Sequence, residues 1–311
     1  HKNFLDAAKK ELELVLKKNI GIVTIIDPLY PLLLKEIPDP PPFLTYLGTL
    51  DNTAPDISVV GSRNATSYGL STSENLSYNL SKKGFQIVSG LARGIDSMAH
   101  KGALRANGKT IAVMGSGLNK IYPRENKHLF CDIAAKGAVF SEFKVNTDPF
   151  PQNFPIRNRI IAGLSCGSII VEAAQRSGSL ITARLANEYN REVFAVPGSI
   201  KSKKSQGTHF LLKQGAKLVE NEMDIIDELH QFIHLKTCDN DSSLQNKTDN
   251  SKLDKYKIIN FLEPYPVHID VLIEKSKINP SKVISQLLDL ELEGRVIRQK
   301  GDYYSIPEEY H

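Results

Sequence analysis

The feature that most constrains the fold is an alternation of short apolar runs with longer helical stretches between residues 56 and 219. The runs read ISVV, QIVS, TIAVM, AVFS, SIIV, EVFAV and KLVE. Short apolar runs separated by helix-length segments are typical of parallel strands joined by crossover helices. The sequence therefore predicts an α/β fold whose parallel sheet is covered on both faces.

Composition divides the chain into four segments. Residues 1–50 hold one amphipathic helical stretch and the proline cluster IPDPPP, which enforces extended chain, so we expect a short N-terminal extension. Residues 51–235 carry the alternating pattern. Residues 236–252 are polar and poor in apolar side chains, which is typical of a flexible linker. Residues 253–311 are predicted to form a separate small domain.

Charge and cysteine content narrow the class of protein. The net charge is +4, and the positive excess lies in residues 51–235, which suits a polyanionic partner without requiring one. The three cysteines, Cys131, Cys166 and Cys238, show no paired spacing, so we expect a reduced cytoplasmic protein without disulfides. No apolar run approaches the roughly 18 residues of a membrane span, and no signal-peptide pattern is present, so we expect no membrane association.

Glycines and arginines gather in the loops that follow the predicted strands. GSR follows ISVV, GLARG follows QIVS, GSG follows TIAVM, and RSGS comes soon after SIIV. In an open parallel sheet these loops meet at one edge, where backbone amides and helix N-termini attract anions. The loop arginines are Arg63, Arg93, Arg124 and Arg176. We therefore expect a phosphate-binding edge.

Two more arginines begin a predicted helix in the stretch NFPIRNRIIAGL. Arg157 and Arg159 lie in its first turns, where the helix dipole is already positive and acidic side chains are favoured. A bound phosphate would offset both the helix dipole and the guanidinium charge. The alternative is an ion pair of either arginine with a carboxylate such as Glu142 or Glu172, and the sequence leaves both interpretations open.

The motifs that resemble cofactor-binding or catalytic sites do not have the surrounding sequence that those sites require. ALRANGKT fits a variant nucleotide-binding loop, but a helix precedes it and a strand follows, which is the reverse of the required order. GSGLNK begins like a dinucleotide fingerprint, yet Lys120 stands where a glycine is needed. The histidines show no metal spacing, so no metal or cofactor is expected. Glu172 is the best candidate for an acid, with a structural role towards a loop amide or an arginine as the alternative.

Six successive blocks carry a family resemblance over about residues 25–230. They read VVGSRNATSYG, GFQIVSGLARGIDSMAHKGAL, GKTIAVMGSGLNKIYPRENKHL, FPIRNRIIAGLS, EAAQRSGSLITARLANEYNREVFAVPG and GTHFLLKQGA. In this order they resemble the signature blocks of the DNA-processing protein A family, DprA or Smf. The resemblance implies an extended Rossmann-like domain that binds single-stranded DNA without sequence preference and forms a homodimer. It also implies a non-enzymatic protein that protects incoming DNA and loads RecA in natural transformation.

The resemblance also implies a set of site residues. Arg63 and the run Arg157, Asn158 and Arg159 match motifs that line the family's DNA groove. The implied anion-binding loops contribute Ser89, Gly90, Arg93, Gly94, Ser177, Gly178, Ser179 and Thr182.

Single strands also need aromatic faces for their bases. Phe154, Phe150 and Tyr122 flank the basic loops and are the stacking candidates, although Phe154 could equally pack as a hydrophobic staple. His209 stands where family members often carry asparagine, which puts a phosphate role for that loop in doubt.

The C-terminal segment resembles a winged-helix domain. Helical stretches are expected near 253–262 and 267–275, a third helix begins after Asn279, and RVIRQ and YYSIP are predicted strands. Such a domain often inserts its third helix into a DNA groove. Residues 253–311 are net acidic, so we expect weak DNA binding or a protein contact instead.

Two rival functions use the same loops. Rossmann-like hydrolases of nucleotide N-glycosidic bonds resemble PGGxGTxxE, and aligning their threonine with Thr182 places Leu185 where their catalytic glutamate stands. The substitution argues against a phosphoribohydrolase. A sensor of small phosphorylated nucleotides stays open.

Overall fold

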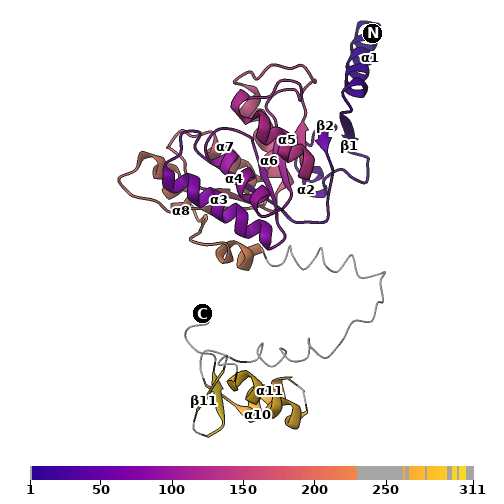
Figure 1. Cartoon of the computed structure of the whole chain (residues 1–311). Coiled ribbons are helices and arrows are strands. Elements are labelled where there is room, and N and C mark those ends of the chain that lie inside the picture. The colour runs from indigo at the N-terminus through magenta and orange to yellow at the C-terminus, as the bar shows by residue number, and fades with distance from the viewer. Residues whose placement is uncertain are drawn as a thin grey trace. The chain divides into compact units, whose positions relative to one another are not determined.

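All the apolar runs predicted as strands are strands in the structure. The structure, a computed structural model, describes residues 2–229, 262, 266–276, 279–292, 296–299 and 301–305. It forms two units, His1–Ser242 and Ser243–His311, which are described separately (Figure 1). The linker predicted at residues 236–252 lies outside the described residues, and so does almost all of the helical stretch expected near 253–262.

The first unit is built on a sheet whose strand order is β1-β2-β6-β5-β4-β3-β7-β8-β9. The strands are β1 (Gly21–Thr24), β2 (Phe43–Gly48), β3 (Asp56–Val60), β4 (Gln86–Ser89), β5 (Thr110–Val113), β6 (Ala138–Ser141), β7 (Gly167–Ile170), β8 (Glu192–Ala195) and β9 (Lys217–Leu218). Strands β3 to β9 are mutually parallel. The chain extends the sheet from β3 first towards β6 and then, from β7, in the opposite direction. This doubly wound order is the predicted Rossmann-like fold.

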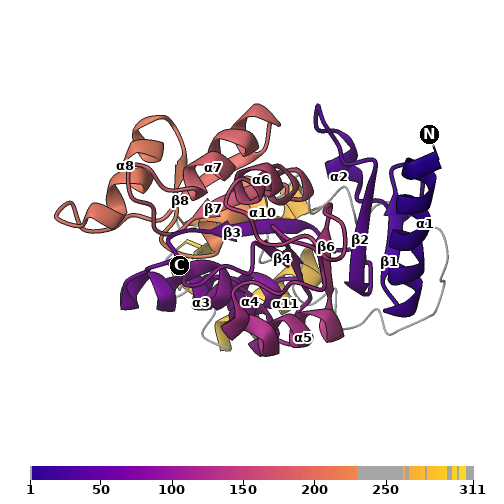
Figure 2. The same ribbon diagram turned by 90° about the horizontal axis from the view of Figure 1, so that it is seen from above.

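Helices cover both faces of this sheet. They are α1 (Lys2–Lys17), α2 (Leu32–Lys35), α3 (Ser67–Lys82), α4 (Ile95–Arg105), α5 (Lys127–Lys136), α6 (Asn153–Leu164), α7 (Ser179–Glu188) and α8 (Gln206–Lys213). Figure 2 shows α3, α4 and α5 on one face and α2, α6 and α7 on the other. Among the described residues, no helix combines the length and apolar character needed to cross a bilayer.

Successive side chains of the central strand β3 pack into two separate hydrophobic cores, one on each face of the sheet. Val59 packs in a cluster with Leu80 of α3, whereas the next residue, Val60, packs with Ile161 of α6. All four side chains are almost inaccessible to water. Burial of a side chain of this size contributes about 1.5–3 kcal/mol, so the two-sided pattern of the strands fixes which helix covers which face.

The N-terminal segment adds the antiparallel edge of the sheet. Strand β2 pairs with β6, placing Thr45 opposite Ser141, and the Thr45 hydroxyl donates to the Ser141 carbonyl at 2.9 Å. Strand β1 pairs with β2. In α1, the Glu11 carboxylate accepts a hydrogen bond from the Val145 amide. Residues expected to be a mere extension thus complete one edge of the first unit.

The second unit contains a three-stranded sheet in the order β10-β12-β11. Its described elements are β10 (Val267–His268), α10 (Ile269–Ser276), α11 (Pro280–Leu292), β11 (Ile297–Gln299) and β12 (Tyr303–Ser305). Leu272 of α10 packs with Val283 and Leu287 of α11 in a small core. The two predicted strands are therefore confirmed, and a short third strand precedes α10.

His100 of α4 is buried against the sheet without a full set of partners. Its Nδ1 lies 2.7 Å from Thr110 Oγ1, and that hydroxyl already donates to the Ile87 carbonyl at 2.6 Å. Nδ1 must therefore carry the proton of the neutral ring, while Nε2 has no partner among the described residues. Burial, with a smaller contribution from Arg157, lowers the pKa of His100 to about 3.

This histidine should make the fold sensitive to acid. The unfolded chain takes up the proton near the usual pKa of about 6.5, whereas the fold resists it, so stability present above about pH 6.5 is lost as the pH falls towards 3. Between about pH 6 and pH 4, His100→Gln should reduce the pH dependence of the unfolding free energy by about 1.4 kcal/mol per pH unit. Urea denaturation across that range measures both slopes, and equal slopes would contradict the assignment.

Candidate nucleic-acid interface

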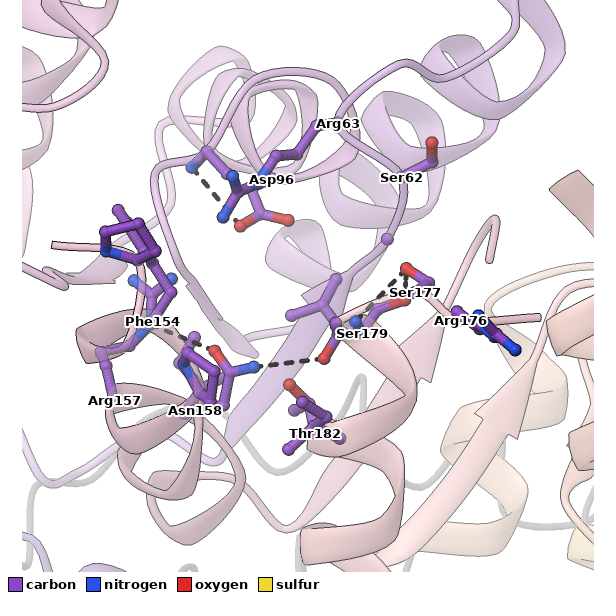
Figure 3. Close-up of a pocket in the computed structure, with 18 of the residues that line it drawn as sticks. Ser62, Arg63, Asp96, Phe154, Arg157, Asn158, Arg176, Ser177, Ser179 and Thr182 are labelled. Carbon is purple, nitrogen blue, oxygen red and sulfur yellow. Dashed lines mark hydrogen bonds between the residues drawn. The ribbon is translucent and has the colours of Figure 1, made fainter. Parts of the chain in front are cut away.

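A cavity of about 520 Å³ opens where the parallel strands end. One wall continues β3 through Gly61, Ser62 and Arg63, and the opposite wall comes from the segment after β7 and the first turns of α6 and α7 (Figure 3). Because β3 and β7 are neighbours from which the chain proceeds in opposite directions, the cavity lies at the topological switch point of the sheet. This is where open α/β sheets bind ligands.

Helix N-termini give the cavity a positive potential. Helix α7 begins at Ser179, and α6 supplies Phe154 and Asn158 from its first turns. The hydroxyls of Ser177 and Ser179 lie 2.8 Å apart at the start of α7. Helix N-termini carry a partial positive charge and unpaired amides, so this corner suits a phosphate group.

Arg63 is one of two exposed arginines that line the cavity, and Arg176 is the other. The Arg63 guanidinium lies over the Phe154 ring, 5.0 Å from the centroid, and within the described residues it has no carboxylate partner. Tyr122 packs against the same ring, with centroids 5.7 Å apart. Phe154 is therefore half-buried between cations and an aromatic ring at the cavity, an arrangement that suits base stacking as well as packing.

Arg157 lies beneath the cavity. Its side chain is 3% exposed, and Nη1 donates to the Gly90 carbonyl at 2.9 Å and to the Val113 carbonyl. These carbonyls lie at the ends of β4 and β5, so Arg157 ties two strand ends to α6. Burial lowers the pKa of Arg157 to about 10, and the neighbouring Asp96 acts in the opposite direction.

Asp96, a residue that the sequence analysis did not single out, is the acidic partner in this floor. Its carboxylate accepts hydrogen bonds from the amides of Gly90 at 3.2 Å and Ala92 at 3.4 Å. Burial raises the pKa of Asp96, and Arg157 lowers it. A Cβ added at Gly90 would lie within 3 Å of both charged groups, which explains the glycine. The signal in the sequence was an acid in the first turn of a helix that follows a glycine-rich loop.

Arg159 faces away from the cavity. It pairs with Glu142 at 2.5 Å and with Asp39 at 3.3 Å, and it also donates to the Asp39 carbonyl. Burial raises the pKa of Glu142, and Arg159 counters the shift. Of the two interpretations of this helix start, the ion pair is thus confirmed for Arg159.

Gly90 and Arg93 line a smaller adjoining pocket of about 170 Å³, which shares Arg63, Tyr122 and Phe154 with the main cavity. Arg93 forms a two-pronged ion pair with Glu125, both contacts being 2.7 Å. Because both partners are exposed, this pair can open to admit a phosphate at little cost.

Most of the predicted site residues border the cavity itself. They are Arg63, Phe154, Arg157, Asn158, Ser177, Gly178, Ser179 and Thr182.

Two others have structural positions. The Ser89 hydroxyl is buried and donates to the Val59 carbonyl, and Gly94 adopts a positive φ of 75° at the start of α4. The DNA-binding role of the whole set stays a prediction.

Glu172 has the structural role that was the alternative for it. It is buried, and its carboxylate accepts hydrogen bonds from the Thr66 amide at 3.0 Å and from the Thr66 hydroxyl. Thr66 caps α3, so Glu172 fixes the loop that carries Arg63.

In the described part of the chain, no three His, Cys, Asp or Glu side chains are grouped to hold a metal ion.

The buried position of Arg157 predicts a large effect on stability. Arg157→Met should lower the unfolding free energy by about 3–5 kcal/mol, because it removes the positive charge near the buried Asp96 carboxylate and the donor to the buried Gly90 and Val113 carbonyls. Arg93→Met, which opens an exposed ion pair, is the matched control and should change stability little. Urea denaturation compares the two variants, and equal small effects would show that Arg157 is not needed under the cavity.

The chain matches two family models. Residues 21–230 match DNA recombination-mediator protein A, and residues 245–302 match the DprA winged helix domain. The second unit is therefore a winged-helix domain.

Relatives and solved structures agree with these matches. Protein Smf of Synechocystis is 47% identical over 218 residues, which are 68% of this chain but only 55% of that protein. The structure of DprA from Streptococcus pneumoniae is 46% identical, with a TM-score of 0.65, and the match covers 67% of this chain and 74% of the other. That of DprA from Helicobacter pylori, which concerns a single-stranded DNA binding mode, is 31% identical, with a TM-score of 0.62 and coverages of 68% and 96%. The chain belongs to the DNA recombination-mediator protein A family, DprA or Smf.

Proposed function

We propose that this chain binds single-stranded DNA without sequence preference at the cavity. In this proposal it is a non-enzymatic recombination mediator of the cytoplasm that protects incoming DNA and loads RecA in natural transformation. The observation that carries the proposal is an exposed Arg63, without a carboxylate partner in the part of the chain that the structure describes, which stacks on Phe154 opposite the hydroxyls and amides that begin α7. A single strand is bound by a cation, an aromatic face for its bases and a helix N-terminus for its phosphates.

The lack of sequence preference has a physical basis in the cavity. Asparagine and aspartate are common readers of base edges, but Asn158 already donates to the Gly178 carbonyl at 3.2 Å and accepts from Arg157. Asp96 is engaged with loop amides. The groups left to contact DNA include Arg63, Arg176, serine hydroxyls and an aromatic ring, which bind phosphates and base faces of any sequence.

A homodimer and a RecA contact belong to the same proposal. Support for the homodimer comes from the edge strand β9 and its flanking chain, where Phe210 of α8, Leu218 of β9 and Met223 are each about half exposed. An open sheet edge with exposed apolar side chains is a surface that a second chain can cover. Support for the DNA partner comes from the Helicobacter pylori relative, whose structure concerns single-stranded DNA.

The rival hydrolase has one observation in its favour. Asp96 lines the cavity and burial raises its pKa, a property that catalytic acids share. Its oxygens are held by loop amides, however, and Leu185 replaces the glutamate of the known hydrolases. Release of a free base from nucleoside monophosphates, lost in Asp96→Asn, would favour the hydrolase over the proposal.

Arg63→Ala should weaken binding to single strands of any sequence. Each lost phosphate contact lowers the slope of log affinity against log salt by about 0.7 for a single strand. Arg105→Ala, which removes an exposed arginine from the far end of α4, is the matched control and should leave the slope unchanged. Fluorescence anisotropy at several salt concentrations measures both.

Two outcomes of these titrations would overturn the proposal. An unchanged slope in Arg63→Ala would remove the cavity as the DNA site. Equal affinities for a mononucleotide and a long strand would identify a nucleotide sensor instead, since a strand should gain from each additional phosphate contact.

A further inference from the structure

We infer that the loop between β8 and α8, residues 197–205, extends the DNA path beyond the cavity by binding phosphates of the same strand. This inference rests on the proposed function. The loop reads PGSIKSKKS and carries Lys201, Lys203 and Lys204. Three lysines within four residues form a concentrated positive charge at an edge where anions are already favoured.

The loop is attached to the cavity wall. The Ala173 amide donates to the Lys204 carbonyl at 2.8 Å, and the Gly207 amide donates back to the Ala173 carbonyl at the same distance. The next residue, Ala174, lines the cavity. The lysine loop and the cavity therefore share one short stretch of backbone, so a strand that leaves the cavity on this side reaches the loop next.

Two further contacts fasten the base of the loop. The Tyr68 hydroxyl donates to the Pro197 carbonyl at 2.9 Å, from the first turn of α3. His209 Nε2 lies 3.1 Å from the Gly198 carbonyl. His209, whose loop had an uncertain phosphate role, thus has a role in holding the lysine loop. Between these anchors Ile200 is 87% exposed, so the tip of the loop projects into solvent.

The lysines are free to bind an anion. Lys201 and Lys203 are exposed and Lys204 is half-buried, and none of them forms an ion pair with a carboxylate that the structure describes. The neighbouring Arg176 is likewise exposed and unpaired among the described residues. Figure 3 places Arg176 on the side of the cavity opposite Phe154. Arg63, Arg176 and the lysine loop therefore mark successive positions for phosphates along one edge.

This arrangement favours a long polyanion over a small phosphate. A single phosphate or nucleotide is satisfied inside the cavity, whereas a strand that crosses the edge meets additional cations after leaving it. The contribution of the loop should therefore appear only with strands longer than the cavity accommodates. Each lysine that contacts a phosphate adds about 0.7 to the salt slope, so the three together add about 2.

The test replaces all three lysines by glutamine in the full chain and uses oligothymidylates of about 4 and about 16 nucleotides, the range of site sizes seen for single-strand-binding folds. We expect unchanged affinity for the short strand. For the long strand we expect weaker binding and a salt slope smaller by about 2. Replacing the same residues by arginine keeps the charge and should retain the wild-type slope.

The matched control neutralises Lys82, Lys83 and Lys136. These lysines are exposed at the C-terminal ends of α3 and α5, at the opposite edge of the sheet, and their loss changes the net charge equally. If the control lowers the long-strand slope as much as the loop variant does, only overall charge matters and the inference is wrong. An unchanged slope in the loop variant also overturns it while leaving the proposed function intact, provided that Arg63→Ala still weakens binding. If the wild-type chain binds neither the short nor the long strand, both the proposed function and this inference are wrong.

Discussion

The structure of the candidate site depends on one buried interaction, the Arg157 guanidinium and the Asp96 carboxylate held among strand-end carbonyls and loop amides. The sheet leaves the carbonyls of Gly90 and Val113 at its edge, and α6 brings a cation to them. Asp96 in turn orders the loop after β4. Buried charges are tolerated only when an opposite charge and hydrogen bonds compensate them. The cavity above this floor therefore depends on both Arg157 and Asp96.

A division of labour among the arginines follows from this floor. Arg157 is buried and binds the carbonyls at two strand ends, and Arg159 holds α6 to Glu142 and Asp39. Of the three arginines, only Arg63 faces solvent without a carboxylate partner that the structure describes. An arginine-rich motif is therefore not a set of equivalent phosphate ligands. Its members differ in burial, and burial decides which of them stabilise the fold and which are available to a ligand.

Much of the fold was predictable because the strands are buried on both faces and read as uninterrupted apolar runs. Strand β2 was missed because FLTYLG is neither an uninterrupted apolar run nor a regular alternation, and because it follows a proline cluster. The different directions of Arg157 and Arg159 could have been predicted: residues two apart on a helix do not share a face, so both could not point at one phosphate. Asp96 could not be placed, because its role depends on a loop amide and on an arginine 61 positions later in the chain.

The fixed floor of the cavity also lowers the free-energy cost of binding through the exposed cations. Binding costs free energy for every side chain that it immobilises, of the order of 0.5–1.5 kcal/mol for flexible ones. Here Arg157, Asp96 and Glu172 are already fixed in the unbound protein, so only the exposed groups, such as Arg63, lose freedom on binding. A surface of this kind binds a passing strand through electrostatic contacts that exchange readily with salt and water. Such exchange is what a protein needs if it holds a strand without regard to sequence and later releases it.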